Sequence, residues 1–432
     1  MLLVLVDSFT PRIAYTFEFI FKDRKIDYSL TESVEDFKKS SAFKINYSST
    51  QVADCYALSP TKILYDFDVK YYSTTKSNFE HFECLAFNGT SDPCASIFYI
   101  LTRYEEYFIG QRDQFGRFSG KQSTLFKFNW HEQAICDRWS TLLIQSIEKY
   151  YNKELKPLKI PATSIPSFDI DNAYAYKNKG FFRTTLSVCK DLLLARRHRM
   201  KERRLVLMGR RRDPYDTFDR IYSLSELGLK INVFWLLGDF SKYDKNISYR
   251  NEKQKRLIKK MAEKCQIGIH PSVKSNEYEY FLHNEIERLS LILKKTVIRS
   301  RQHFLKLKIP ETYRTLVQQE IRNDHTMGFA DIVGFRCGTA RPHFWFDVEK
   351  NKKTSLVIRP FMFMDGTLNE YLHLNPDQAI EKINRLFDEV STYGGEFSFI
   401  WHNETIGDYG SWKGWSKVFK HSIEQSIKMN EK

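Results

Sequence analysis

The sequence predicts an α/β protein whose larger part is built around a parallel sheet. In the second half of the chain, apolar runs of strand length alternate with amphipathic stretches of helical spacing. The chain is also long and well supplied with core residues, since 42% of its 432 residues are hydrophobic. This length suits two or three domains. From the pattern alone, the sheet is either doubly wound or closed as a barrel.

Composition excludes several classes of protein. Aromatic residues make up 15% of the chain and there are only 12 Pro and 18 Gly, which excludes a disordered or collagen-like chain. The seven cysteines form no Cys-x-x-Cys pair, which argues against a disulfide framework and a thiolate zinc site. No apolar run approaches the roughly 18 residues of a membrane span. Residues 1–6 lack the features of a signal peptide, so we expect a first strand there and a cytoplasmic protein.

The formal charge of +14 is partly local, because nine Lys and Arg residues lie between Arg196 and Arg212. Such a segment is either a solvated helix and loop or a binding surface for nucleic acid or an anionic membrane. No aromatic residues are interleaved with these charges, which favours the solvated segment, and we expect no nucleic-acid partner.

A polar stretch with two prolines, residues 153–161, predicts a domain boundary. The first region, residues 1–155, is expected to be an α+β domain without an assigned role. Ser91-Asp92-Pro93 is typical of a helix start, and a second helix is expected over residues 134–151.

The second region, residues 160–432, contains the alternating pattern. Spacings of three and four predict helices around residues 281–293 and 379–390. Strands are expected near residues 164–169, 231–237, 267–270, 296–304, 331–336, 356–362 and 397–401.

Charged and imidazole side chains follow these strands where each one ends. They are Asp169 and Asp171, His270, Arg301 and His303, Arg336, Asp365, and His402. Each has an ordinary explanation when taken singly, since an Asp-x-Asp is as often a turn or a helix cap. The carboxyl ends of parallel strands share one face, however, and that face carries the active site in such folds. We therefore expect these groups to converge.

The chemistry that such a set supports is metal-assisted hydrolysis. One carboxylate and two neutral imidazoles can hold a divalent cation that acidifies water. A second carboxylate can then accept a proton, and a further histidine can donate one to the leaving group. The residues predict an esterase or an amidase.

The order of four short motifs resembles that of the polysaccharide deacetylases, the NodB-like carbohydrate esterase family 4. The resemblance covers residues 160 to 432, and residues 213–219 (DPYDTFD) and 310–314 (PETYR) are similar to a bacterial subgroup with an extra N-terminal domain. It implies a deformed (β/α)7 barrel that removes N-acetyl or O-acetyl groups from a glycan with a divalent metal, commonly zinc. The motifs are residues 167–171 (SFDID), 267–272 (IGIHPS), 301–303 (RQH) and 399–402 (FIWH).

The resemblance also implies roles for single residues. Asp169 matches the general base and Arg301 the arginine that orients it, while His402 matches the general acid. Asp324 lies where the family has an aspartate that orients the acid histidine. Asp171 and His270 match metal ligands.

One motif departs from the family pattern, because Lys274 stands where the second metal histidine is expected. We hypothesise that His303 supplies the missing imidazole. The alternative for His303 is a supporting or substrate-binding role. Loss of the ligand at position 274 also leaves open a catalytically inactive protein that only binds glycans.

Arg336 and Trp401 are the candidates for substrate binding. Arg336 either faces the cleft or forms an ion pair at the rim, and Trp401 is a sugar platform or part of the core, like Trp345 and Trp412. The expected partner is an acetylated polysaccharide or oligosaccharide. A cytoplasmic enzyme would suit a lipid-linked or nucleotide-linked precursor, with the basic segment near an anionic membrane face.

Overall fold

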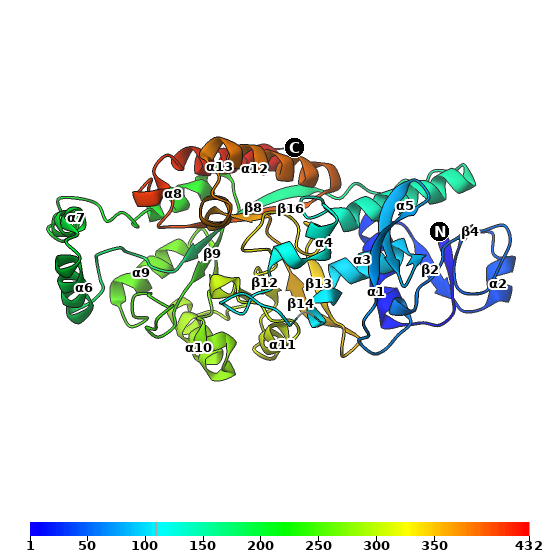
Figure 1. Ribbon diagram of the computed structural model, residues 1–432, viewed down its shortest axis with the longest axis horizontal. Coiled ribbons are helices and arrows are strands. Elements are labelled where there is room, and N and C mark those ends of the chain that lie inside the picture. Colours follow the sequence, from blue (N-terminus) through cyan, green and yellow to red (C-terminus); the bar gives the residue numbers. More distant parts are fainter. Residues whose placement is uncertain (109, 432) are drawn as a thin grey trace.

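The computed structural model describes residues 1–108 and 110–431 and shows two regions arranged end to end (Figure 1). An extended segment, residues 154–161, connects them. The helices and strands of the first region are β1 (Leu2–Val6), α1 (Pro11–Phe21), β2 (Tyr28–Thr31), α2 (Val34–Lys39), β3 (Phe43–Tyr47), β4 (Tyr56–Ala57), β5 (Thr74–Phe79), β6 (Phe82–Phe87), β7 (Thr90–Ser91), α3 (Pro93–Leu101), α4 (Thr124–Lys127) and α5 (Ile135–Tyr151).

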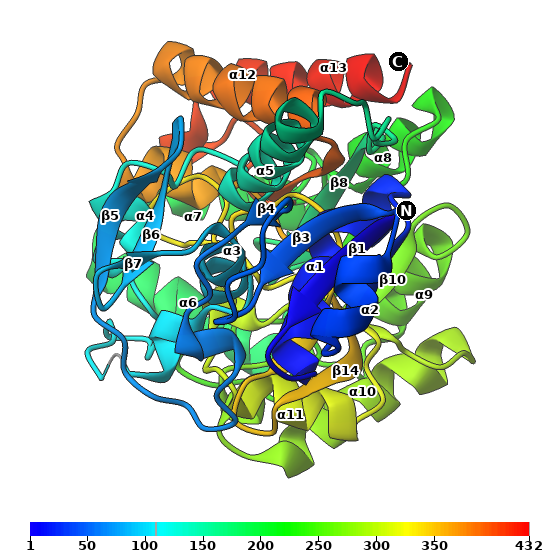
Figure 2. The same ribbon diagram turned by 90° about the vertical axis from the view of Figure 1, so that its right-hand side faces the viewer.

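The first region contains two sheets. A parallel sheet has the order β2-β1-β3-β4, and an antiparallel sheet has the order β5-β6-β7 (Figure 2). The parallel sheet contains a strand–helix–strand unit, β1-α1-β2. The helix α3 begins where the sequence predicts it, because the Asp92 side chain accepts a hydrogen bond from the Ala95 backbone N–H and Pro93 occupies the first turn.

The second region is built on one large sheet. Its helices and strands are β8 (Ala162–Ile170), α6 (Phe181–Leu193), α7 (Arg197–Leu207), α8 (Phe218–Ser223), β9 (Asn232–Trp235), α9 (Glu252–Met261), β10 (Gln266–Ile269), α10 (Glu279–Leu293), β11 (Arg299–Ser300), α11 (Glu311–Gln318), β12 (Asn323–Asp324), β13 (His343–Asp347), β14 (Lys352–Ile358), β15 (Phe363–Met364), α12 (Pro376–Tyr393), β16 (Gly395–His402) and α13 (Ser416–Asn430).

The nine strands have the order β13-β14-β12-β11-β10-β9-β8-β16-β15. Neighbours are parallel except β13 and β14. The α/β class is therefore confirmed. Among the described residues β13 and β15 are the edges of the sheet, so it is open and the (β/α)7 barrel is not confirmed. Three strands, β11, β12 and β15, span only two residues each and offer few backbone hydrogen bonds with which to close a barrel.

One predicted strand is wrong. Residues 331–336 form no helix or strand, and the corresponding place in the sheet is taken by β12. The segment instead contacts the first region, where the Phe335 N–H donates to the His131 backbone oxygen at 2.7 Å. At Gly334, with φ +118°, a Cβ would lie 1.9 Å from that same oxygen. Its apolar residues are thus buried without strand pairing.

The two regions share a buried interface. Phe346 and Val348 from the second region pack in the hydrophobic core of the first. Beside them the Arg336 guanidinium lies 2.6 Å from Glu106 Oε2, and Arg103 Nε lies 2.8 Å from Glu106 Oε1. All three of these charged side chains are buried.

Helices cover the sheet and leave the carboxyl ends of its strands free to form a site. The helices α12 and α13 lie side by side, with α13 against β8 (Figures 1 and 2). Asn375 caps α12 in a complete capping box, which fixes the start of the helix. Within the described part of the chain, no helix combines the length and apolar content that a membrane span requires.

Candidate metal centre and its acid–base groups

Three side chains at the carboxyl ends of strands converge on one point. Asp171 follows β8, His270 follows β10 and His303 follows β11. His270 Nε2 lies 3.2 Å from Asp171 Oδ1, and His303 Nε2 lies 3.3 Å from Asp171 Oδ2. One ligand atom from each residue lies within 4.8 Å of the others, so a single cation can contact all three.

Hydrogen bonds on the far side of each imidazole leave Nε2 free to bind a cation. His270 Nδ1 donates to the backbone oxygen of Arg301 at 2.6 Å, and His303 Nδ1 lies 2.9 Å from Asp244 Oδ1. Asp171 Oδ1 is buried and has no hydrogen-bond partner among the described residues. Two neutral imidazoles and a carboxylate that point at each other leave lone pairs unsatisfied, and a divalent cation fits this donor set.

The electrostatics of the cluster also favour a cation. Burial raises the pKa of Asp171, but the charge of His303 and the close contacts with both imidazoles outweigh it and hold the pKa well below its usual range. Burial lowers the pKa of His303, whereas Asp171 and Asp244 raise it to about 9. The two carboxylates therefore attract positive charge to His303, either a proton or a metal ion.

A second carboxylate, Asp169, lies beside this cluster. Its Oδ2 is 3.9 Å from His270 Nε2, and its Oδ1 accepts a hydrogen bond from Arg301 Nη1 at 2.8 Å. The guanidinium is fully buried, donates through Nε to the His325 backbone oxygen and lies over the ring of Phe234. Arg301 thus holds Asp169 in one orientation through a charge-assisted hydrogen bond.

A separate histidine faces the same space. His402 ends β16, and its Nδ1 lies 2.8 Å from Asp365 Oδ1. Burial lowers the pKa of His402, but the charge and hydrogen bond of Asp365 outweigh it and raise the pKa well above its usual value. The raised pKa favours the protonated imidazole, whose Nε2 lies opposite the bond to Asp365.

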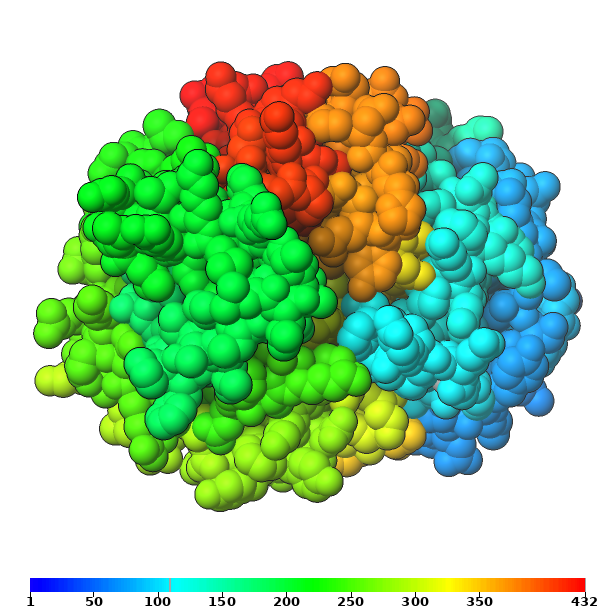
Figure 3. All heavy atoms as spheres, turned by 60° about the vertical axis from the view of Figure 1, so that its left-hand side comes forward, coloured from blue at the N-terminus to red at the C-terminus, as the bar shows by residue number. Residues whose placement is uncertain are grey.

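Both groups of residues line one pocket of about 450 Å³. The face turned to the viewer in Figure 3 is hollowed where the green, orange and cyan parts of the chain meet, and these parts supply several of its walls. Burial, followed by the charge of Asp171, raises the pKa of the pocket carboxyl Glu404 to about 7. Aromatic side chains complete the lining, namely Tyr215, Phe304, Tyr371, Tyr409 and Trp412.

The first region contributes to this pocket through Arg117. Its guanidinium donates to the Phe304 backbone oxygen at 3.1 Å and to the Tyr371 hydroxyl at 3.0 Å. Phe115 stacks on Phe304 with ring centroids 4.8 Å apart. Residues assigned to the two halves of the chain therefore build the wall together.

The structure places both residues that were expected to bind substrate outside the pocket. Arg336 lies in the loop of residues 331–336, where a strand was expected. It is buried in an ion pair with Glu106, so it does not face the cleft. Trp401 is fully buried and packs against Phe419 of α13. Its neighbour His402 takes the pocket side, and successive strand residues point to opposite faces.

Asp324 does not orient His402. Its carboxylate accepts hydrogen bonds from the Ser300 and Thr326 hydroxyls and the Thr326 backbone N–H. The carboxylate that contacts His402 is Asp365. Lys274, in place of the family histidine, is exposed and lies over the ring of Phe281.

Two site residues were not assigned a role from the sequence. Asp365 follows the sixth expected strand, and this strand-end position was the available signal. Asp244 lies in the loop after β9, in a segment without a recognisable motif. Only the folded chain brings Asp244 to His303.

Comparison with known proteins gives one family match and several structural likenesses. Residues 2–152 match a family of unknown function, DUF7033. No curated protein matches the sequence. The fold is similar to a protein of Mycobacterium smegmatis provisionally described as a polysaccharide deacetylase, at 16% identity and a TM-score of 0.39, over 63% of this chain and 90% of that one.

Two further solved structures are similar to the same extent. A polysaccharide deacetylase from Bacillus cereus has 11% identity and a TM-score of 0.30, over 62% of this chain and 87% of that one. The PuuE allantoinase has 11% identity and a TM-score of 0.38, over 61% of this chain and 84% of that one. At this level of similarity the chemistry of the site rests on its own residues.

Proposed function

We propose that the protein is a metal-dependent hydrolase that removes acetyl groups from a polysaccharide or glycan precursor. The observation that carries the proposal is the pairing of two devices across one pocket. Asp171, His270 and His303 form a three-donor cluster, with Asp169 beside it, and His402 is held separately by Asp365. A hydrolase that must activate water and protonate a leaving group needs both devices.

Asp171, His270 and His303 would hold the cation, and a set of two imidazoles and one carboxylate suits zinc. When bound, such a cation acidifies water and polarises a carbonyl. Asp244 would fix the tautomer and orientation of His303 through Nδ1. The Arg301 backbone oxygen would do the same for His270.

Asp169 would act as the general base. Arg301 holds it next to the cluster, where it can accept a proton from attacking water. Arg301 is a positioning residue in this scheme, because its guanidinium contacts Asp169 and the His325 backbone oxygen and does not line the pocket.

His402 would act as the general acid. Asp365 keeps the imidazole protonated, so Nε2 can donate a proton to the departing amine or hydroxyl as the carbon–nitrogen or carbon–oxygen bond breaks. After one turnover Asp169 would carry one extra proton and His402 would lack one. Loss of the proton from Asp169 to water and uptake of a proton from water by His402 would restore the starting state.

The lining of the pocket supports a carbohydrate substrate. Trp412 is half-buried in the wall, and Tyr215 and Tyr409 add hydroxyl groups. Aromatic faces combined with hydroxyl and carboxylate groups suit a sugar ring. The exposed position of Lys274 leaves the cluster to His303, so the substitution at position 274 does not by itself favour an inactive glycan-binding protein.

The test is acetate release from N-acetylated and O-acetylated oligosaccharides by metal-loaded protein, run beside His402→Ala. We expect wild-type turnover, a severe loss of turnover in the variant and an unchanged metal content. Equal loss of metal and turnover would assign His402 to the metal cluster and contradict its role as the acid. Metal-loaded protein that releases no acetate from either substrate class would contradict the deacetylase proposal.

A further inference from the structure

A helical hairpin protrudes from the second region. It consists of α6 (Phe181–Leu193) and α7 (Arg197–Leu207), which lie at the left end of the molecule in Figure 1. Turning that end forward places this green segment on the face toward the viewer (Figure 3). The pairs Arg203–Asp191 at 2.7 Å and Arg203–Ser187 at 2.5 Å fasten α7 to α6.

The amphipathicity of α6 is inverted, because its apolar face points to solvent. Phe182, Leu186, Cys189 and Leu193 follow each other at spacings of four, three and four residues, so they form one stripe along the helix. Phe182 is 83% exposed, Leu186 71% and Leu193 87%. Phe181 and Leu192 flank the stripe and are also exposed. Among the described residues, none packs against this face closely enough to bury it.

The hairpin and the loop after it are strongly basic. Residues 181–212 contain eleven Lys and Arg residues and only two acids, so they carry +9 of the +14 charge of the chain. Both acids, Asp191 and Glu202, are buried and paired with arginines. The outer surface of the hairpin therefore presents cations without exposed carboxylates. On α7, spacings of four and three place Arg197, Lys201 and Arg204 on one exposed face.

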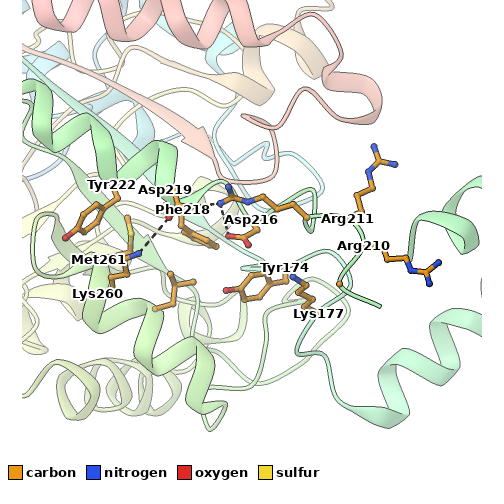
Figure 4. Close-up of a pocket in the computed structure, with 13 residues that line it drawn as sticks. Tyr174, Lys177, Arg210, Arg211, Asp216, Phe218, Asp219, Tyr222, Lys260 and Met261 are labelled. Carbon is orange, nitrogen blue, oxygen red and sulfur yellow. Dashed lines mark hydrogen bonds and ion pairs between the residues drawn. The ribbon is translucent and has the colours of Figure 1, made fainter. Parts of the chain in front are cut away.

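The positive surface continues into a pocket of about 550 Å³ at the base of the hairpin (Figure 4). Arg210 and Arg211 lie on the loop at one end of this pocket, and Lys260 lies at the other end beside Tyr222. The two pocket acids, Asp216 and Asp219, are paired with Arg212, and Asp219 also lies 3.8 Å from Lys260 Nζ. The pocket thus offers cations to an anionic group that approaches from the hairpin side.

We infer that the α6–α7 hairpin is a docking surface for an anionic lipid bilayer. An exposed helix face of Phe and Leu can enter the boundary between headgroups and acyl chains, while neighbouring Lys and Arg contact lipid phosphates. The hairpin offers both the apolar and the basic signal that reversible membrane attachment needs. This inference does not depend on the proposed activity.

Charge and side-chain chemistry argue against other occupants. A second copy of the hairpin would bring two surfaces of +9 together, which like-charge repulsion opposes. Nucleic acid would satisfy the charges and could stack on phenylalanine, but Leu186, Leu192 and Leu193 offer bases no aromatic ring. Hydrocarbon accommodates all six side chains of the apolar face.

The hairpin is joined directly to the wall of the candidate active site. Glu202 of α7 accepts hydrogen bonds from the Tyr176 hydroxyl at 3.1 Å and from the Tyr409 hydroxyl, and Tyr409 lines the pocket. Docking would therefore hold the mouth of the pocket near the bilayer. If the proposed function is correct, its substrate class is a glycan presented at a membrane surface.

The test is co-sedimentation of the full chain with vesicles of phosphatidylcholine, with and without one third phosphatidylglycerol. We expect binding to the anionic vesicles that weakens at high salt, and about a tenfold or greater loss in either of two triple variants. The apolar variant is Phe182→Ser, Leu186→Ser and Leu193→Ser, and the charge variant is Arg197→Ala, Lys201→Ala and Arg204→Ala.

Matched controls change equally exposed residues elsewhere. The apolar control is Tyr278→Ser, Tyr280→Ser and Leu291→Ser around α10, and the charge control is Lys149→Ala, Lys156→Ala and Lys159→Ala near the connecting segment. Both controls and the metal-cluster variant Asp171→Ala should bind vesicles like the wild type. Binding kept by Asp171→Ala separates this proposal from the fate of the proposed activity.

A label on Cys189 reports insertion directly. Of the seven free cysteines, Cys189 alone is exposed, and it lies within the apolar stripe. An environment-sensitive fluorophore there should shift its emission to shorter wavelength with anionic vesicles and not with phosphatidylcholine alone. Absence of vesicle binding at low salt would overturn the proposal. Vesicle binding that leaves the emission unshifted and that a nucleic-acid competitor abolishes would also overturn it. So would a stable dimer that the apolar variant dissociates.

Discussion

Asp365 contacts His402 at two points, since its carboxylate accepts a hydrogen bond from the His402 backbone N–H at 2.8 Å and lies 2.8 Å from Nδ1 of the same residue. The Thr405 hydroxyl donates a third hydrogen bond to this carboxylate. Asp365 is fully buried. The imidazole is therefore fixed in orientation and in charge by one side chain that lies 37 positions away in the sequence.

The first prediction concerns this pair. Asp365→Asn keeps the shape of the side chain but removes the charge that raises the pKa of His402. A general acid must be protonated, so a lower pKa moves the alkaline limb of the kcat profile to lower pH. We expect turnover near pH 8 to fall about tenfold or more and to recover in part as the pH is lowered. A pH series of kcat measures this.

Glu370→Gln is the matched control for Asp365→Asn. It removes another carboxyl group from the same pocket without breaking a described hydrogen bond to His402. Its alkaline limb should stay close to that of the wild type. An alkaline limb that Asp365→Asn leaves in place would assign the titration to a group other than His402.

The second prediction is loss of metal from the three-donor cluster. Asp171→Ala and His303→Ala each remove one of the three ligands found among the described residues, so bound zinc should fall from near one ion per chain to about a tenth of that or less. Elemental analysis after gel filtration measures it. Lys274→His is the informative control, because Lys274 is exposed and its replacement should not change the metal content. Full metal content in His303→Ala would contradict the assigned ligand set.

The third prediction concerns the carboxylate behind His303. Asp244→Asn keeps a hydrogen-bond acceptor near Nδ1 but removes the charge that orients and polarises the imidazole. We expect metal affinity to fall about 10-fold to 100-fold with the fold intact. Competition with a chromophoric chelator measures the affinity. An unchanged affinity would contradict this role. Asp244 would then serve only the local fold, through the hydrogen bonds that it accepts from the Ser241 hydroxyl and the Val273 backbone N–H.

The fourth prediction separates two tryptophans. Trp412 lines the pocket, whereas Trp401 is buried against α13. Trp412→Ala should raise KM by about three- to tenfold with little change in kcat, because an aromatic contact with the substrate is lost. Trp401→Phe should lower the stability of the fold and leave KM unchanged. Equal effects on KM would mean that Trp412 contributes only to the shape of the pocket.

The fifth prediction concerns stability at the junction of the two regions. Arg336→Met leaves the buried Glu106 with only Arg103 as its ionic partner. We expect the free energy of unfolding to fall by about 3 kcal/mol, measured by urea unfolding with tryptophan fluorescence. Adding Glu106→Gln should restore part of the loss, because the uncompensated charge is removed as well. Lys39→Ala, at an exposed pair with Glu35, should change the free energy by about 0.5 kcal/mol or less.

The sequence predicts the long elements well. Seven elements lie within a few residues of their predicted positions, namely the strands β8, β9, β10 and β16 and the helices α5, α10 and α12. Each of them contains a clear hydrophobic pattern of its own. The two-residue strands β11, β12 and β15 carry no such pattern. Residues 331–336 do carry one, yet Ile332, Val333 and Phe335 pack into the two hydrophobic cores without strand pairing.

Part of the site also follows from sequence position. Strand ends alone place Asp169, Asp171, His270, His303 and His402 on one face, and the structure brings all five to the pocket. Successive side chains of a strand point to opposite faces, so placing His402 in the pocket already excludes Trp401 from it. Arg336 failed for a different reason, since its strand does not exist and its charge pairs with Glu106 from the other region.

The sequence by itself determined the α/β class, the long elements and the identity of the candidate ligands, because these depend on local patterns and on residue type. Tertiary structure alone decided which carboxylate lies behind each histidine, since Asp244 and Asp365 reach His303 and His402 across 59 and 37 positions of chain. It also decided that the apolar face of α6 is exposed. A helical pattern shows that one face is apolar, but only packing shows what covers it.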